Sequence, residues 1–292
     1  MSSIREIKRR IRVIGNIQHV TGAMKMVASA KLRRAQSQVW ATRPYAQKTA
    51  EVAGRLALAP NAQMLPLVAS REVKKTCYVL MIGDKGLAGA YNANLIHLVQ
   101  ECLAKEEKPA ALIILGRKGV QYFRRRSVEM LKYYVDIGDE PDLSLARELA
   151  RQLMEIFLNG QVDEVNLVYA RFYTILRNVP QVERLLPIET PSVEGAEMMD
   201  YIYEPEPVGV LEAILPRYCE IKVYQALLEA KASEISSRMV AMDGATKNSG
   251  EMIDQLTLSF NKARQAAITT ELLEVATGAE ALKAQGQRRD AA

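Results

Sequence analysis

Apolar and small residues recur at alternating steps of four and three over a long stretch in the last third of the chain. The stretch runs from Leu228 to Ala267, and no proline interrupts it. A heptad repeat held over this distance is typical of a helix that packs lengthwise against another helix. The repeat positions are Leu228, Ala232, Ile235, Met239, Met242, Thr246, Ser249, Ile253, Leu256, Phe260, Ala263 and Ala267.

The repeat continues beyond Ala267 after a slip of one residue. It resumes at Ile268, Leu272, Val275, Ala279 and Leu282. A continuous helix from Arg217 to Leu282 would be about 100 Å long at 1.5 Å per residue. A compact domain does not need a helix of this length, so the pattern predicts a helix that projects from the body of the protein.

A second apolar stripe follows the N-terminus. Ser3 and Glu6 form a capping-box pattern, which is typical of the first residues of a helix. Three-residue steps near Ile17 predict a stammer, which would shift the stripe around the helix. The stripe consists of Ile4, Ile7, Ile11, Ile14, Ile17, Val20, Met24, Val27 or Ala28, Leu32, Ala35 and Val39.

Helix-compatible sequence continues from this stripe to Ala59, and Pro44 is the expected position of a kink. An intact helix of this length would measure about 80 Å. Each terminal helix has one apolar stripe that needs a partner, and the other terminal helix supplies one. The two ends of the chain are therefore predicted to form an antiparallel coiled coil.

The middle of the chain alternates between short apolar runs and amphipathic stretches. Strands that alternate with helices of this length are typical of a small α/β domain with a mainly parallel sheet. Pro216 predicts a kink or break near the start of the C-terminal helix. The expected strands are 76–82, 110–115, 131–137, 164–173 and 182–188, the last two paired, and the expected helices are 91–106, 116–126 and 143–158.

The predicted fold class is thus α/β plus a long antiparallel coiled coil. The N- and C-terminal helices form a rod, and a small α/β domain with a mainly parallel sheet is inserted between them. The expected divisions are an N-terminal coiled-coil helix at 1–59, an α/β globular domain at 74–207 and a C-terminal coiled-coil helix at 208–292.

Basic residues gather near the N-terminus of this 292-residue chain, whose net charge is +5. They suggest an anionic partner, and a nucleic-acid-binding coiled coil is one interpretation. The apolar stripe on the same helix, and the lack of interleaved aromatic residues for base stacking, favour the solvated outer face of a coiled coil. The basic residues are Arg5, Lys8, Arg9, Arg10, Arg12, Lys25, Lys31, Arg33 and Arg34, against the single acid Glu6.

A glycine-rich turn at 83–89 follows the first expected strand and could hold a phosphate at the start of a helix. It matches neither GxGxxG nor GxxxxGK[ST], because Lys85 precedes Gly86. A tight strand-to-helix turn at the surface is the favoured interpretation. A nucleotide-dependent enzyme that uses Lys85 is a third class of function, which ATP turnover by the isolated chain would support.

Few other residues could carry chemistry. The chain has two histidines and three widely spaced cysteines, too few for a catalytic triad or a metal cluster. No apolar run reaches the roughly 18 residues needed to span a bilayer, and no signal peptide is evident. We expect no catalytic, cofactor-binding or metal-binding residues, and a reducing, cytoplasm-facing location. The histidines and cysteines are His19, His97, Cys77, Cys102 and Cys219.

Four collinear blocks of the sequence resemble the γ subunit family of F-type ATP synthases, and together they extend over nearly the whole chain. They are residues 23–35, 84–92, 232–267 with Asn-Lys-Ala-Arg-Gln-Ala-Ala at its end, and 268–281 with Ile-Thr-Thr-Glu-Leu-Leu-Glu-Val-Ala-Thr-Gly-Ala at its start. The chain departs from many relatives at Gly15 and Gly22, where lysine is common. It lacks the dithiol insert of chloroplast γ subunits, so the resemblance is to the bacterial type.

The resemblance implies the central rotor shaft of an F1Fo ATP synthase, a non-catalytic subunit of a proton- or ion-translocating complex. The shaft would stand inside the α3β3 hexamer, and the α/β domain would rest with the ε subunit on the c-ring. Rotation would couple ion transport to ATP synthesis or hydrolysis at the α/β interfaces. The implied location is peripheral, at the cytoplasmic face of the cell membrane. The implied partners include no nucleic acid, and the membrane is reached only through the complex.

The resemblance also assigns contact residues. Met24, Lys25, Arg264 and Gln265 should lie at the level where β-subunit loops grip the shaft. Glu271 and Thr277 should lie nearer the upper bearing in the hexamer. The foot that meets the c-ring and ε is expected at Tyr201, Tyr203 and Glu204.

Overall fold

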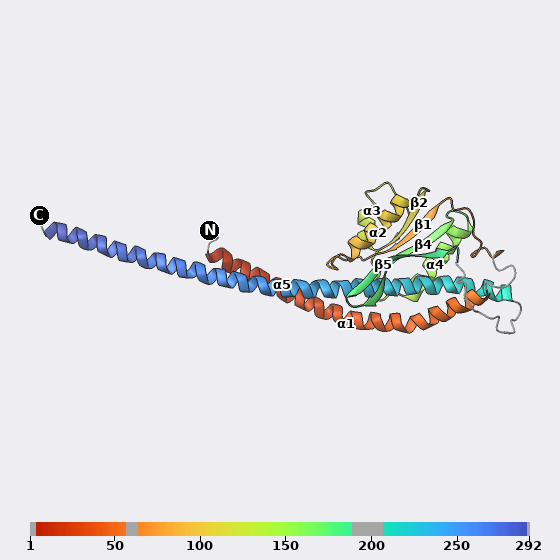
Figure 1. The fold of residues 1–292 in the computed structure, drawn as a ribbon, viewed down its shortest axis with the longest axis horizontal. Helices are drawn as coiled ribbons and strands as arrows, with labels where there is room; N and C mark the ends of the chain where they lie inside the picture. The colour runs from red at the N-terminus through yellow and green to blue at the C-terminus, as the bar shows by residue number, and fades with distance from the viewer. Residues whose placement is uncertain (1–3, 57–63, 189–206, 291–292) are drawn as a thin grey trace. The chain divides into compact units, whose positions relative to one another are not determined.

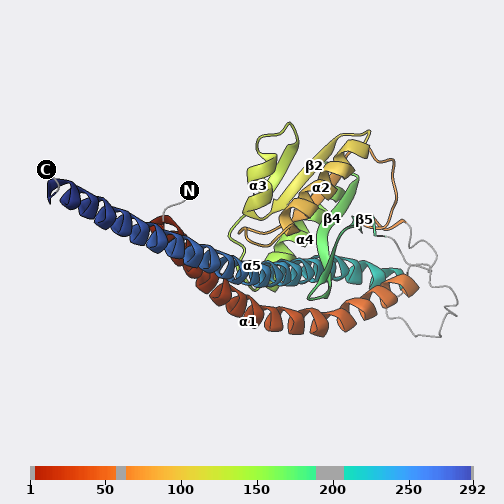
Figure 2. The same cartoon turned by 60° about the vertical axis from the view of Figure 1, so that its left-hand side comes forward.

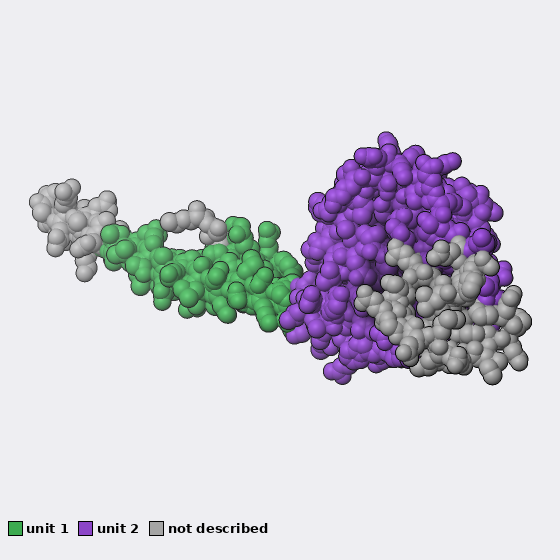
Figure 3. Space-filling view, turned by 45° about the vertical axis from the view of Figure 1, so that its right-hand side comes forward, with its two compact units in different colours: residues 1–24, 242–292 green, residues 25–241 purple. Residues whose placement is uncertain are grey.

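The structure, a computed structural model, describes residues 4–56, 64–188 and 207–290. Contacts between residues divide the chain into two compact units, shown in green and purple in Figure 3. We call residues Met1–Met24 with Met242–Ala292 the paired-helix unit, and Lys25–Ala241 the body. Two long helices contribute residues to both units.

These two helices are α1, Ile4–Leu56, and α5, Pro207–Asp290 (Figure 1). The 84 residues of α5 correspond to about 126 Å of helix at 1.5 Å per residue. The expectation that Pro216 breaks the helix is wrong, because Pro216 lies inside α5 and the helix begins before it. Its neighbours Leu215 and Cys219 are buried in the body core, and this packing offsets the hydrogen bond that proline cannot donate.

In the paired-helix unit, α1 and α5 lie side by side and run antiparallel, as Figures 1 and 2 show. Thr21 Oγ1 lies 2.8 Å from Thr246 Oγ1. A Cβ atom built on Gly250 would lie 3.1 Å from Gln18 Nε2. Facing residue numbers therefore add up to 267 or 268, which is the mark of an antiparallel register. The predicted coiled coil of the two chain ends is confirmed here.

The predicted stammer in α1 is wrong. Ile17 and Val20 are exposed, at 48% and 59%, whereas Thr21 is 8% exposed. The buried positions continue the regular heptad through Gln18 and Thr21, because a threonine whose hydroxyl is hydrogen-bonded can occupy a seam position that the hydrophobic pattern assigns to an apolar residue.

The seam on α5 ends before the predicted Ala267. Each predicted position from Met242 to Ala263 is buried or half-buried, and Ala267 is exposed. The antiparallel register places Ile4, the first residue of α1, opposite Ala263 or Arg264. The seam therefore stops where the described part of the partner helix begins.

The body contains a five-stranded sheet with the order β3-β2-β1-β4-β5. The first four strands in this order are parallel, and β5 pairs antiparallel with β4, which confirms the predicted mainly parallel sheet. The strands are β1 Thr76–Met81, β2 Ala110–Leu115, β3 Glu129–Tyr134, β4 Glu164–Thr174 and β5 Arg177–Leu186.

Helices cover both faces of this sheet. On one face, α2 (Tyr91–Lys105) and α3 (Arg117–Phe123) share a hydrophobic cluster with alternate residues of β1, β2 and β4. On the other face, α4 (Leu143–Leu158) and α5 share the largest cluster. The part of α1 that lies in the body packs outside α5, in a third cluster that also contains Phe172 of β4.

Candidate functional site: the terminal helices

Several apolar side chains are exposed on α5 between Arg264 and Ala279. From Arg264 to Ala279 every side chain is exposed. Ile268 is 49% exposed, Leu272 65% and Val275 67%. Exposed apolar residues that gather on one element mark a surface that meets another protein. This segment is a candidate contact surface.

Four of the expected contact residues, Arg264, Gln265, Glu271 and Thr277, lie on this exposed segment. The hydroxyl of Thr277 donates a hydrogen bond of 2.7 Å to the carbonyl oxygen of Leu273 within the helix, so the helix itself satisfies it. Glu271 is exposed as well. These four side chains are available to a partner along about 20 Å of helix.

Within the paired-helix unit, Met24 does not lie opposite Arg264. Met24 is half-buried and Lys25 is exposed. The register places Met24 opposite Asp243, which lies about 30 Å along α5 from Arg264. The contact of these four residues with β-subunit loops stays a prediction. The expected foot residues Tyr201, Tyr203 and Glu204 lie outside the described residues.

A polar layer crosses the seam of the paired-helix unit, and only its α5 side lies on the repeat predicted from the sequence. Thr246 donates its hydroxyl toward Thr21 Oγ1, and the Thr21 hydroxyl bonds to the carbonyl oxygen of Ile17 at 3.0 Å. Ser249 is 7% exposed and donates to the carbonyl oxygen of Ala245 at 2.7 Å. Strict heptad counting on α1 from Ile4 would have placed Thr21 in the seam. The Thr246–Thr21 bond favours this register of the two helices, because a slip would break it, although Thr246 also donates to the carbonyl oxygen of Met242 within its own helix.

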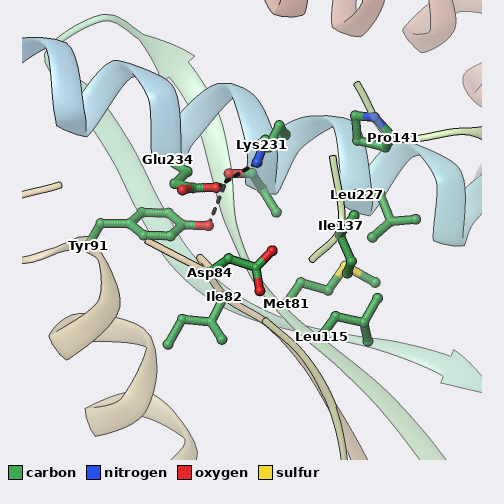
Figure 4. Close-up of a pocket in the computed structure, with 11 residues that line it drawn as sticks. Met81, Ile82, Asp84, Tyr91, Leu115, Ile137, Pro141, Leu227, Lys231 and Glu234 are labelled. Carbon is green, nitrogen blue, oxygen red and sulfur yellow. Dashed lines mark hydrogen bonds and ion pairs between the residues drawn. The ribbon is translucent and has the colours of Figure 1, made fainter. Parts of the chain in front are cut away.

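The glycine-rich turn after β1 is closed by α5. Figure 4 shows Glu234 and Lys231 of α5 facing this turn. A Cβ atom on Gly83 would lie 3.0 Å from Glu234 Oε1. Arg238 forms an ion pair with Glu234 at 2.7 Å. Arg238 also donates a hydrogen bond of 3.3 Å to the carbonyl oxygen of Gly86. The buried carboxylate of Glu234 lies beside this turn and disfavours a phosphate there, because like charges repel. The two cavities that adjoin this turn hold about 30 and 150 Å³, both below the roughly 300 Å³ of a small-molecule site.

Tyr91 holds the same turn to α5. Its hydroxyl donates a hydrogen bond of 3.0 Å to the carbonyl oxygen of Ala230. Burial raises the pKa of Tyr91 well above its ordinary value, and the charge of Glu234 adds to this effect. The phenol therefore stays protonated at neutral pH and remains a donor. The favoured interpretation of this segment as a tight structural turn agrees with this geometry.

The remaining titratable groups give no reactive cluster within the described ranges. Burial raises the pKa of the Cys77 and Cys219 thiols to about 12, so both remain thiols at neutral pH. The described residues contain no group of three histidine, cysteine or acidic side chains placed to hold a metal ion. None of the helices, in the part of the chain that the structure describes, is long and apolar enough to cross a bilayer.

Solved structures similar to this chain include chains of mitochondrial ATP synthases. The chain matches a structure described as the central stalk and c-ring of the Tetrahymena thermophila mitochondrial ATP synthase with a TM-score of 0.60 and 25% identity, over 77% of this chain and 99% of that one. A chain of the Euglena gracilis mitochondrial ATP synthase, from a structure of its OSCP, F1 and c-ring, matches with a TM-score of 0.68 over 96% of this chain and 95% of that one. At 18% identity the second match supports the fold alone.

Sequence comparisons give the family. A family model described as ATP synthase matches residues 3–282. The ATP synthase gamma chain of Moorella thermoacetica is 62% identical over 97% of this chain and all of the relative. That of Pelotomaculum thermopropionicum is 44% identical over the same shares. These relatives give no support to the nucleic-acid-binding alternative, and the resemblance seen in the sequence is confirmed: the chain belongs to the gamma-chain family of ATP synthases.

Proposed function

We propose that this chain is the central rotor shaft of an F1Fo ATP synthase. It couples ion-driven rotation of a c-ring to ATP synthesis or hydrolysis at the α/β interfaces of an α3β3 hexamer. Family membership supports this function, and so do the structural relatives described as a central stalk with a c-ring. The observation that carries it is the pair of long terminal helices, one of which continues past its partner as an exposed apolar helix.

A shaft must transmit torque and also turn within its bearing. The heptad seam and its polar layer resist separation and sliding of the two helices, which serves the first need. The end of α5 serves the second need. Its exposed surface there combines Leu272 and Val275 with small residues such as Ala276 and Gly278. Apolar contacts have little directional preference, so such a surface passes from one partner subunit to the next without a strong bond to any.

We assign the contacts with α and β subunits to separate levels of the shaft. Met24, Lys25, Arg264 and Gln265 are assigned to the β-subunit loops that grip the shaft, and within the paired-helix unit Met24 lies about 30 Å along α5 from Arg264. Glu271 and Thr277 lie further along α5, toward the upper bearing. The foot that contacts the c-ring and ε is assigned to Tyr201, Tyr203 and Glu204.

The chain has no catalytic role of its own in this proposal, since ATP chemistry belongs to the α/β interfaces. It is peripheral to the cytoplasmic face of the membrane and reaches the membrane only through ε and the c-ring. Its proposed divisions remain 1–59 and 208–292 for the shaft helices, and 74–207 for the α/β domain between them.

Crosslinking in the purified complex tests this function. In a C102S background, which removes the half-exposed native thiol, Arg264→Cys is joined to the neighbouring β subunit through a reducible linker. Steady-state ATP hydrolysis should stop, and reduction of the linker should restore it, because the shaft must turn for each site to complete its cycle. The control is Leu176→Cys, which is 83% exposed at the tip of the β4–β5 hairpin.

The Leu176→Cys variant carries the same linker, left unattached to any subunit, and should hydrolyse ATP as the parent does. Full multi-turnover hydrolysis after complete crosslinking at position 264 would contradict the proposed contact between Arg264 and the β subunit. Purification of the chain without stoichiometric α and β subunits would overturn the rotor function itself.

A further inference from the structure

A buried carboxylate joins three elements inside the body. The side chain of Glu229 on α5 is 1% exposed, and it accepts hydrogen bonds from Arg43 Nε of α1 at 2.9 Å and from the Phe172 N–H of β4 at 2.8 Å. The second nitrogen of the guanidinium, Nη2, also donates to the Phe172 carbonyl oxygen at 2.6 Å. Both polar main-chain groups of Phe172 therefore bond to one ion pair. We call Arg43, Glu229 and the Phe172 main chain the clamp.

The same face of α5 makes further bonds to the main chain of β4 and of the turn that follows it. Ser233 donates to the carbonyl oxygen of Ala170 at 2.9 Å, and Ser236 donates to that of Ile175 at 2.5 Å. Both serines are fully buried. Bonds of this kind fix distance and angle, whereas apolar surfaces can roll or slide past one another. They hold α5 to the sheet at a fixed angle.

Stability alone does not explain why an ion pair lies at this position. Buried ion pairs are often no more stabilising than well-packed apolar residues of similar volume, because removing two charges from water is costly. An apolar pair at these positions would pack into the third hydrophobic cluster, which contains Val39, Leu228 and the Phe172 side chain. What apolar residues could not supply is the directional bonding of a bidentate guanidinium to a carboxylate and a main chain.

We propose that Arg43 and Glu229 are torque-bearing positioning residues: the clamp makes α1, α5 and the sheet turn as one unit when the rotor works against a load. This inference rests on the proposed rotor function. Without the clamp, α1 would remain packed on α5 through apolar contacts, but it would yield under torque. The exposed ion pair between Arg34 of α1 and Glu140, at 3.7 Å, offers a matched contrast, since exposed pairs contribute little rigidity.

The test compares loaded and unloaded function of the complete ATP synthase. Glu229→Ala and Arg43→Lys are made with Arg34→Ala as the control. Unloaded function is measured as ATP hydrolysis by the uncoupled complex. Loaded function is measured as the largest gradient of the transported ion that the complex sustains in vesicles. We expect a loss of the sustained gradient at unchanged unloaded hydrolysis for Glu229→Ala, a smaller loss for Arg43→Lys, and no loss for Arg34→Ala.

A merely structural role predicts a different result. If Glu229→Ala lowers loaded and unloaded function in the same proportion, or lowers neither, the clamp bears no torque. If this variant fails to assemble, the ratio of sustained gradient to unloaded hydrolysis is measured in Glu229→Gln and Arg43→Lys instead. Both substitutions nearly preserve side-chain volume. Faster hydrogen exchange at the Phe172 amide in these variants checks that the clamp has opened. An unaltered complex that sustains no gradient would instead count against the rotor function.

Discussion

Helix α5 has the same heptad repeat in two regions that differ in burial. Between Ala226 and Ser236, within the body, every residue except Lys231 is buried. Between Glu251 and Arg264, within the paired-helix unit, only the seam positions are protected. These are Ile253, Leu256, Phe260 and Ala263.

The difference shows what a heptad repeat reports. It identifies the face that meets the partner helix in both regions, but it says nothing of the other faces. In the body those faces hold Glu229, Ser233 and Ser236, which are polar and nevertheless buried against the sheet. The body therefore adds directional bonds to the apolar seam, whereas the paired-helix unit depends on the seam and one polar layer.

The largest expected difference lies between apolar truncations in the two regions. Ile235 is 2% exposed in the body and Leu272 is 65% exposed in the paired-helix unit. Ile235→Ala should lower the free energy of unfolding by about 2–5 kcal/mol, because it leaves a cavity. Leu272→Ala should change it by less than about 0.5 kcal/mol. Denaturant unfolding of the purified chain measures both, and similar losses would contradict the contrast.

Adding one methyl group should have opposite effects in the two regions. A Cβ atom on Gly119 in α3 would lie 2.7 Å from Ile114 Cγ2, whereas one on Gly15 in α1 would meet nothing within 4 Å. Gly119→Ala should destabilise the body by about 1–3 kcal/mol through overpacking. Gly15→Ala should stabilise helix α1 by about 0.5–1 kcal/mol. Thermal unfolding checks the two signs, and a loss of stability in Gly15→Ala would show a close contact at that position.

The polar layer should make a smaller contribution. Thr21→Val removes the hydroxyl that bonds Thr246 and should cost about 1 kcal/mol, the usual net value of one hydrogen bond. Thr257→Val is the control, because the hydroxyl of Thr257 is exposed and bonds only within its own helix, to Ile253. Amide hydrogen exchange in residues 4–24 should rise in Thr21→Val alone. Equal amide exchange rates in both variants would show that the polar layer does not hold the two helices in register.

Acid should weaken the body gradually. Asp163 accepts the main-chain N–H groups of Lys74 and Lys75 and pairs with Arg71 at 2.6 Å. Burial opposes the charge of Asp163, but these bonds outweigh it and hold the pKa of the carboxyl below its ordinary value of 3.8. A group with a lowered pKa stabilises the fold above that ordinary value, and this contribution is lost as the pH falls through the folded pKa. Unfolding free energies from pH 6 downward should therefore fall less steeply in Asp163→Asn.

Much of the fold could be predicted from local patterns. Strand β2 and helix α4 have the expected bounds, because each is a single apolar run or amphipathic stretch that ends at clear breaks. Strand β5 begins at Arg177, five residues before the expected start at 182. Its first residues lie on the edge of the sheet and alternate between exposed and half-buried, so no apolar run in the sequence predicts them. Pairing with β4, a neighbour through the hairpin, makes them a strand.

The sequence by itself determined the two terminal helices, the antiparallel seam between them and the parallel strands of the body, because each leaves a period of apolar residues along the chain. Tertiary structure alone decided that Thr21 lies in the seam, that the seam ends at Ala263, and that Glu229 is buried with Arg43. The physical reason is that buried polar groups must be hydrogen-bonded, and Thr21 and Glu229 find partners in distant segments of the chain. Such partners follow no period in the sequence.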